Sequence, residues 1–365
     1  MISRYLVALL MTPLLALSML PAQAEYQLET VAEGLNFPWS VAFLPDGNYL
    51  VATRPGQLLR ISHAGEVSAP LSGTPEPLVE SQGGYFDIML DQDFADNQTI
   101  YLSFAWGTVD ANATRLVKAT LGEQGLENVE VLFTVSPTKA AGAHFGGRMI
   151  QLADGTIVLS TGDGFDYREA AQDTFSQLGK IIRLNQDGSA PADNPFADGK
   201  AGNPYVWSYG HRNTQGLVVD VATNTIYNHE HGPQGGDEIN RVEKGKNYGW
   251  PAITYGINYS GAYVSPFQSA PGMEQPLKYW VPSIAPSGFA LYQADAFPAW
   301  RGDFFVGALV NKEVRRVDME DGQAVAEEPL FAELDARIRD VRVGPDGFLY
   351  LLTDSEAGKL IRVKP

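Results

Sequence analysis

After residue 24 the chain returns repeatedly to one pattern of apolar and polar positions. A run in which the two kinds alternate leads to an Asp-Gly turn or an equivalent, and a second alternating run follows. Successive side chains of a strand point to opposite faces, and Asp-Gly is a favoured hairpin turn, so each unit predicts a β-hairpin. The units cover residues 39–53, 86–104, 149–161, 217–228, 288–308 and 341–353.

Six hairpins at a spacing of roughly 50–70 residues predict an all-β chain folded as a six-bladed β-propeller. We expect a single propeller domain over residues 25–365, with a short helix at Glu169–Leu178 inside a connecting loop. A pair of β-sandwiches is the alternative. In a propeller, one loop from every blade reaches the mouth of the central channel, so residues remote in sequence can share a pocket there.

The first 24 residues predict a signal peptide. Arg4 supplies a short positive region, an almost unbroken apolar run covers residues 6–20, and residues 22–24 match a small-x-small cleavage site. A membrane anchor is the alternative, although no later apolar run is long enough to cross a bilayer. We therefore expect an exported, soluble protein that is periplasmic in a Gram-negative host.

Composition and charge narrow the possible chemistry. The chain has no cysteine, so disulfides and thiolate sites are excluded, whereas oxygen-ligated metals and carboxylate, histidine or arginine chemistry remain. A formal net charge of −17 argues against nucleic acid or an anionic membrane surface as a partner. It is compatible with cation binding and with neutral or weakly charged substrates, and equally with an acidic surface that only confers solubility.

Residues 210–251 concentrate more candidate chemistry than any other stretch. Three of the five histidines lie there: His211, His229 and His231. Gly232-Pro233 forms a backbone corner that can aim successive carbonyl oxygens at one point, as a hard cation requires. Glu238 and the Asn247-Tyr248 pair are placed to add oxygens at a neighbouring point. The alternative is a Gly/Pro-rich turn whose acids are merely solvated.

His144, in the run A-H-F-G-G-R, is the candidate general base. The two glycines leave the backbone bare beside it, and a carboxylate such as Asp163 can hold its second ring nitrogen. A purely structural histidine is the alternative. Neither a G-x-S-x-G elbow nor an H-E-x-x-H helix occurs, so serine hydrolases and zinc proteases of those kinds gain no support.

Arg337 and Arg339 stand two apart in A-R-I-R-D, so on a strand both guanidinium groups point the same way. Together with Arg212 they can bind a planar, multiply anionic ligand through forked hydrogen bonds. The alternative is that these arginines pair with the abundant carboxylates.

Taken in order, these motifs resemble those of the soluble aldose sugar dehydrogenases that depend on pyrroloquinoline quinone (PQQ), the glucose/sorbosone dehydrogenase family. The resemblance covers nearly the whole mature chain, from G-L-N-F-P-W-S-V-A-F-L-P-D-G to L-Y-L-L-T-D. It implies a six-bladed propeller with the quinone lying flat over the channel. The base would be His144, with Asp163 as the acid that orients it.

The resemblance also implies the ligands of a quinone and of calcium. The residues that would hold the quinone are Gln82, Arg212, Asn213, Tyr259, Arg337 and Arg339. The implied calcium ligands are the carbonyl oxygens of Gly232 and Pro233 beside the cofactor, and Glu238 and Tyr248 at a second, structural site. One position departs from the family pattern, because Val310 stands where a lysine usually reaches the quinone. Lys312 or Arg315 could substitute, or the cofactor loses one cation.

The implied reaction is the oxidation of an aldose at C1 to a lactone, with hydride transfer to the quinone and calcium polarising a quinone carbonyl. An external electron acceptor is expected, since no C-x-x-C-H haem motif is present. Two alternatives stay open: a calcium-dependent propeller hydrolase resembling a lactonase, and a non-enzymatic sugar-binding or scaffold propeller. The sequence does not choose between a monomer and a homodimer.

Overall fold

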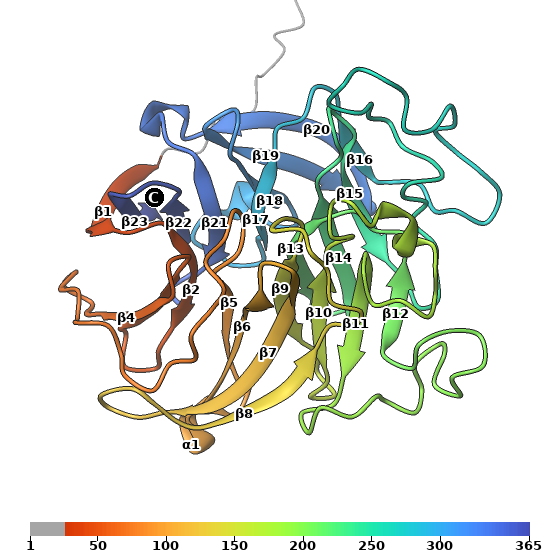
Figure 1. Ribbon diagram of the computed structural model, residues 1–365. Helices are drawn as coiled ribbons and strands as arrows, with labels where there is room; N and C mark the ends of the chain where they lie inside the picture. Colours follow the sequence, from red (N-terminus) through yellow and green to blue (C-terminus); the bar gives the residue numbers. More distant parts are fainter. Residues whose placement is uncertain (1–25) are drawn as a thin grey trace, which may run out of the picture.

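Six antiparallel sheets follow one another around a ring in the computed structural model, which describes residues 26–365 (Figure 1). Five of the sheets have four strands and one has three. The six-bladed β-propeller predicted from the hairpin pattern is therefore confirmed, and the two-sandwich alternative is wrong. The predicted signal peptide and its cleavage site at residues 22–24 lie outside the described residues.

The strands of each blade follow one another in the chain. The first three blades are β2 (Pro38–Phe43), β3 (Tyr49–Thr53) and β4 (Gln57–Ile61); β5 (Tyr85–Leu90), β6 (Thr99–Thr108), β7 (Ala111–Leu121) and β8 (Leu126–Thr134); and β9 (Gly146–Gln151), β10 (Ile157–Thr161), β11 (Lys180–Leu184) and β12 (Val206–Tyr209). The next two are β13 (Thr214–Asp220), β14 (Thr225–Glu230), β15 (Asp237–Val242) and β16 (Lys278–Trp280); and β17 (Pro286–Leu291), β18 (Phe304–Ala308), β19 (Glu313–Glu320) and β20 (Gln323–Leu330).

The last blade closes the ring by combining the two ends of the chain. It contains β21 (Ile338–Val343), β22 (Leu349–Thr353) and β23 (Gly358–Lys364), and its fourth strand is the N-terminal β1 (Gln27–Leu35). Strands β1 and β23 run antiparallel, with Gln27 opposite Lys364 and Leu35 opposite Gly358. Figure 1 shows these red and blue strands side by side. Closure in this way leaves the first and last blades joined by backbone hydrogen bonds.

Each predicted hairpin forms the first two strands of one blade. The first strand of every blade lies nearest the axis and contacts the first strands of the neighbouring blades. Helical structure is limited to the four-residue helix α1 (Phe94–Asn97) and three short 3₁₀ helices, η1 (Arg168–Ala171), η2 (Pro298–Trp300) and η3 (Ala332–Leu334), within the described residues.

The helix expected at Glu169–Leu178 is reduced to η1. The buried ammonium group of Lys180 donates hydrogen bonds to the carbonyl oxygens of Ala170, Ala171 and Leu178 at 2.7–3.0 Å. Carbonyls that point together at one cation cannot all point along a helix axis. A side chain outside the segment therefore overrides its helical tendency.

The hydrophobic core is divided among the interfaces between neighbouring blades. At one interface, Leu50 and Leu58 of the first blade join Tyr85 and Phe104 of the next, and all four side chains are buried. Equivalent clusters lie between each successive pair of blades around the ring. Burying one such side chain stabilises the fold by about 1.5–3 kcal/mol, so the ring is held by side-chain packing as well as by strand pairing.

Between the innermost strands lies a closed network of charges. Arg148 Nη1 lies 2.7 Å from Asp340 Oδ1 and 3.8 Å from Asp87 Oδ1, while Arg342 lies within hydrogen-bonding distance of both aspartates. Arg148 also lies against the ring of Trp39. The network ties blades together beneath the channel mouth, and it explains why Arg148, although it follows the His144 motif, is not available to a ligand. No helix among residues 26–365 is long and apolar enough to span a bilayer.

Candidate functional site

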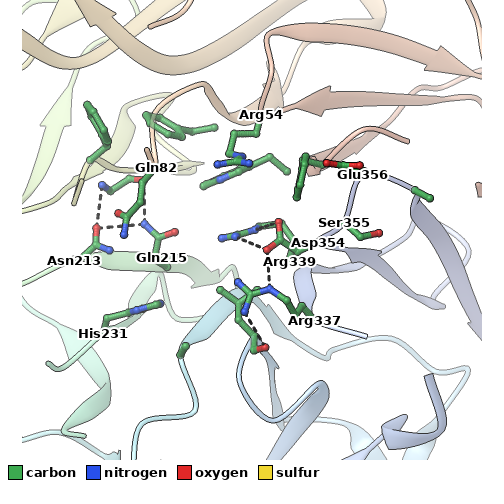
Figure 2. Close-up of a pocket in the computed structure, with 18 residues that line it drawn as sticks. Arg54, Gln82, Asn213, Gln215, His231, Arg337, Arg339, Asp354, Ser355 and Glu356 are labelled. Carbon is green, nitrogen blue, oxygen red and sulfur yellow. Dashed lines mark hydrogen bonds and ion pairs between the residues drawn. The ribbon is translucent and has the colours of Figure 1, made fainter. Parts of the chain in front are cut away.

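A cavity of about 870 Å³ opens at the end of the ring where the predicted loops converge (Figure 2). Segments from all six blades line it, although the blades of β9–β12 and β17–β20 contribute mainly apolar residues such as Phe145 and Leu309. The polar lining residues are Arg54, Gln82, Asn213, Gln215, His231, Arg337, Arg339, Asp354, Ser355 and Glu356. Four of the residues predicted to hold the quinone, Gln82, Asn213, Arg337 and Arg339, therefore share one cavity.

His144 lies beside this cavity and is hydrogen-bonded to Asp163. The distance from His144 Nδ1 to Asp163 Oδ1 is 2.7 Å, and both side chains are buried. Asp163 Oδ1 also accepts from the amide of Phe165 at 2.9 Å, and Asp163 Oδ2 accepts from Trp250 Nε1 at 2.8 Å. With Nδ1 as the donor to Asp163, Nε2 is left as an acceptor, and it makes no hydrogen bond within the described residues. This is the arrangement of an oriented general base.

The local backbone explains the A-H-F-G-G-R sequence. His144 has a φ of 54°, in the left-handed region, and its amide donates to Gln82 Oε1 at 2.9 Å. Gly147 has a φ of 97°, and a Cβ atom there would lie 2.6 Å from the ring of Phe86. Only glycine meets both requirements, so this residue lets the chain turn from His144 into β9 against the neighbouring blade.

Burial sets the protonation of the base. It lowers the pKa of His144 below its ordinary value of 6.5, and the nearby cations of Arg212 and Lys139 lower it further, whereas Asp163 raises it. The same kind of burial lowers the pKa of Lys139 to about 7. His144 is therefore neutral at neutral pH and able to accept a proton.

Arg212 and Asn213 reach the site from the loop before β13. Arg212 Nη1 donates to the carbonyl oxygens of His231 at 3.2 Å and Gly232 at 2.6 Å, and its guanidinium carbon lies 5.2 Å from the centre of the Trp250 ring. Asn213 Oδ1 accepts from the amide of Gly146 at 3.2 Å. Hydrogen bonds to the protein therefore fix both side chains. Arg212 is held against the Gly232-Pro233 corner, and Asn213 is held against the loop that carries His144.

Arg337 and Arg339 converge on one acid, Asp354. Arg337 Nε lies 3.0 Å and Arg339 Nη2 lies 3.1 Å from Asp354 Oδ2 (Figure 2). The prediction that the two guanidinium groups point the same way is confirmed. The alternative, that these arginines pair with a carboxylate, also holds for Arg337 and Arg339. Asp354 therefore already neutralises part of the charge that the two arginines would offer an anionic ligand.

The Gly232-Pro233 corner is fixed by two charged side chains. Asp237 Oδ1 accepts the amide hydrogen of Gly232 at 2.9 Å, and the Gly232 carbonyl oxygen accepts from Arg212. Pro233 lines a second cavity of about 340 Å³ together with Phe165, Arg212, Trp250 and Tyr259. Tyr259, the sixth predicted quinone ligand, is 65% exposed at the rim of this second cavity.

Glu238 and Tyr248 line a small recess together with Glu230. Burial, with repulsion from Glu230, raises the pKa of Glu238 well above its usual range. The phenol of Tyr248 points away from these acids, since it donates to the carbonyl of Arg241 at 2.6 Å. The phenol oxygen is therefore not turned toward a cation between these acids. No group of three or more His, Cys, Asp or Glu side chains gathers as a metal site within residues 26–365.

Comparison with known proteins agrees with this geometry. The family model for glucose/sorbosone dehydrogenases matches residues 35–362. The chain belongs to the glucose/sorbosone dehydrogenase family. It is 39% identical to the aldose sugar dehydrogenase YliI of Escherichia coli over 363 residues, which are 97% of this chain and 98% of that protein.

Two solved structures place the family fold on this chain. The crystal structure of the soluble aldose sugar dehydrogenase from Escherichia coli in its apo form is 38% identical, with a TM-score of 0.90 over 93% of this chain and 100% of that one. The PQQ-bound form of the aldose sugar dehydrogenase from Streptomyces coelicolor is 27% identical, with a TM-score of 0.74 over 94% of this chain and 99% of that one.

The position of the family lysine has no cation in this chain. Val310 is 61% exposed and does not line the cavity, which is reached instead by Leu309. Lys312 lies 2.8 Å from Asp335 on the surface, and Arg315 is paired with Glu313. Neither Lys312 nor Arg315 lines the cavity, which favours the other expectation, that the cofactor site has one cation fewer.

Three residues of the site were not predicted from the sequence: Trp250, Asp354 and Arg54. Trp250, in N-Y-G-W-P, holds Asp163, and its place two residues after Tyr248 was the available signal. Asp354 directly follows the last predicted hairpin, residues 341–353. The signal was that an acid at this end of the hairpin lies beside Arg337 and Arg339, which precede the same hairpin. Arg54 follows the corresponding strand of the first blade, and nothing local marks it as different from a surface arginine.

Proposed function

We propose that this protein is a quinoprotein that oxidises aldose sugars at the C1 hydroxyl to lactones, with PQQ as the electron acceptor. The observation that carries the proposal is the buried His144–Asp163 pair next to a cavity lined by amides and arginines. The proposal is also supported by two relatives described above, the aldose sugar dehydrogenase YliI and the PQQ-bound aldose sugar dehydrogenase of Streptomyces coelicolor. The signal peptide predicted at residues 1–24 would deliver the protein to the periplasm, and cell fractionation tests that location. An external acceptor would take the electrons there.

The residues present fit a planar, multiply anionic cofactor. Arg212 Nε is buried and has no hydrogen-bond partner within the described residues, so this guanidinium retains a donor for an incoming acceptor. Gln82 and Asn213 supply amides on the same side of the channel mouth, and Arg337 and Arg339 supply cations across it. A hydrolase would have no need of this donor set.

The Gly-Pro corner fits a calcium ion. The carbonyl oxygens of Gly232 and Pro233 are the proposed ligands, and that of Gly232 accepts from the Arg212 guanidinium at 2.6 Å, so a bound calcium ion would share or displace this contact. Glu238 and Glu230 form a second candidate site, because Asn240 Nδ2 lies 3.5 Å from one and 3.3 Å from the other and holds the two acids close together. A divalent cation would relieve their repulsion.

When bound, the quinone accepts a hydride equivalent and calcium polarises one of its carbonyls. The chain supplies the proton chemistry. His144 Nε2 takes the proton of the anomeric hydroxyl, and Asp163 stabilises the imidazolium that forms through the 2.7 Å contact at Nδ1. Phe165, whose ring packs edge-on against His144 with 5.0 Å between ring centres, limits the access of water to the base.

Reconstitution tests the proposal directly. The purified apoprotein is expected to show no aldose-dependent dye reduction, and to gain it only when PQQ and calcium are added together. Hydrolysis of lactones by the quinone-free protein with calcium would favour the lactonase alternative instead. Full dehydrogenase activity in excess chelator, with metal shown to be absent by elemental analysis, would remove calcium from the mechanism.

The lowered pKa of His144 predicts the acid limb of the pH profile. The base works unprotonated, so activity is lost as the pH falls through the pKa of His144. Because burial places that pKa below 6.5, kcat/KM should be flat through pH 7 and decline only in more acidic solution. A pH–rate profile measured with saturating quinone checks this. An acid limb centred above pH 7 would contradict it.

A further inference from the structure

The cavity contains one arginine that is not paired with an acid. Arg54 lines it together with Arg337 and Arg339, and forms no ion pair with any residue of the 26–365 segment. Arg337 and Arg339 share the carboxylate of Asp354. Two of the three lining cations are thus partly neutralised, whereas the charge of Arg54 remains available to an anion.

Arg54 is held in place without losing that charge. Its Nη1 donates to the carbonyl oxygen of Ser81 at 2.9 Å, and its guanidinium carbon lies 4.6 Å from the centre of the Phe37 ring. Its backbone is bonded on both sides, to the carbonyl of Phe37 at 2.9 Å and to the amide of Tyr85 at 3.1 Å. Neutral partners orient the guanidinium and leave further N–H groups for a ligand.

Arg54 gives the cavity a cation that position 310 does not supply. Val310 replaces the lysine, and Lys312 and Arg315 are engaged with surface acids. Figure 2 shows Arg54 and Arg337 on either side of Arg339 and Asp354, so that the three arginines follow one another on one side of the cavity and Gln82 and Asn213 lie across from them. An anionic ligand that lies along this side of the cavity would meet the charge of Arg54 in addition to the Arg337–Arg339 pair.

We propose that Arg54 binds a carboxylate of the quinone and supplies the cation that Val310 does not. The inference rests on the proposed function, because it assigns a residue to the quinone site. Since Arg54 is only half-buried, solvent screens its charge, and one such contact is expected to change the quinone affinity by roughly tenfold.

Binding of PQQ to the apoprotein at fixed calcium tests this without any catalytic readout. Isothermal titration, supported by quenching of tryptophan fluorescence, is carried out on wild type, Arg54→Gln and Arg54→Lys. Arg54→Gln removes the charge but keeps a polar amide of similar stem length, and its Kd should rise about tenfold. Arg54→Lys keeps the charge but loses the planar guanidinium, so its Kd should rise clearly less than that of Arg54→Gln. Added salt should narrow the difference between the two variants.

A matched control removes the same charge at a distance. Arg301 is exposed and pairs with Asp295 on the surface, so Arg301→Gln should leave the Kd for PQQ unchanged. Thermal melts of every variant show whether the fold is retained. If Arg54→Gln does not fold, Arg54→Met replaces it, because its aliphatic chain keeps the contact with Phe37.

The outcomes separate the two proposals. If wild type does not bind PQQ, the proposed function fails and the assignment of Arg54 falls with it. If wild type binds and Arg54→Gln binds equally well, only the assignment is overturned. An equal loss of affinity in Arg54→Gln and Arg54→Lys would also overturn it, because Arg54 would then act by shaping the loop at Ser81 and not by its charge.

Discussion

Replacing His144 by alanine is expected to lower kcat by roughly two to four orders of magnitude, the contribution of one positioned general base. His144 Nε2 is the only acceptor that the buried pair presents, since Nδ1 is directed at Asp163. Quinone binding should remain close to normal, because the side chains proposed to hold the cofactor, such as Arg212 and Arg339, do not hydrogen-bond to the His144 ring. Turnover at saturating PQQ and the Kd for PQQ measure the two effects separately.

A surface histidine provides the control for this experiment. His63 is exposed and lies in the turn after β4, so His63→Ala should leave both quantities unchanged. Sugar oxidation by His144→Ala within about tenfold of wild type would remove His144 as the general base. A large loss of PQQ affinity in His144→Ala, with turnover preserved, would instead make it a cofactor ligand.

The blades were predictable because the information for them is local. In V-R-V-G-P-D-G-F-L-Y-L-L-T, alternation fixes which residues face the neighbouring blade and the Asp-Gly turn fixes the hairpin. The closure of the ring by β1 and β23 could not be found in this way. Those strands are joined across the whole length of the chain, and no local signal says which edge the N-terminal strand completes.

The site was predictable in its residues but only partly in its contacts. Motifs named the base, the acid and the arginines, and the structure brings them to one channel mouth. They could not show that Arg337 and Arg339 share Asp354, or that the Gly232 carbonyl accepts from Arg212. Each of these contacts joins two loops of one blade that are separate in sequence, and it depends on side-chain and loop conformations that alternation and turn motifs do not specify. The same limit hid Arg54, whose significance depends on what its neighbours have already paired with.

The partial neutralisation of the arginine pair changes what it contributes to the proposed function. Asp354 accepts from both Arg337 and Arg339, and these two cations lower the pKa of its carboxyl, although burial opposes them. Asp354 therefore stays charged, and the trio carries one net positive charge instead of two. An anionic ligand would compete with Asp354 for the guanidinium groups. The unpaired cation of Arg54 and the open donor of Arg212 then matter more for affinity than the number of arginines alone suggests.

Replacing Asp163 by asparagine is expected to lower kcat by on the order of a hundredfold, although the change is nearly isosteric. Asp163 accepts on both oxygens, from His144 Nδ1 and Phe165 on one side and from Trp250 Nε1 on the other. Asparagine has one oxygen and one NH₂ group. If its NH₂ group faces His144, the imidazole must carry its proton on Nε2, which is the nitrogen that has to accept the substrate proton.

The opposite orientation of the introduced amide is also unfavourable, because its NH₂ group would then face the Trp250 N–H, donor against donor. Adding Trp250→Phe removes that conflict, so the double variant should recover part of the lost turnover. The pH profile gives an independent readout. Asp163 raises the pKa of His144, so its neutralisation should move the acid limb to lower pH. A kcat for Asp163→Asn within about threefold of wild type, with the acid limb unmoved, would show that Asp163 supports the loop and does not orient the base.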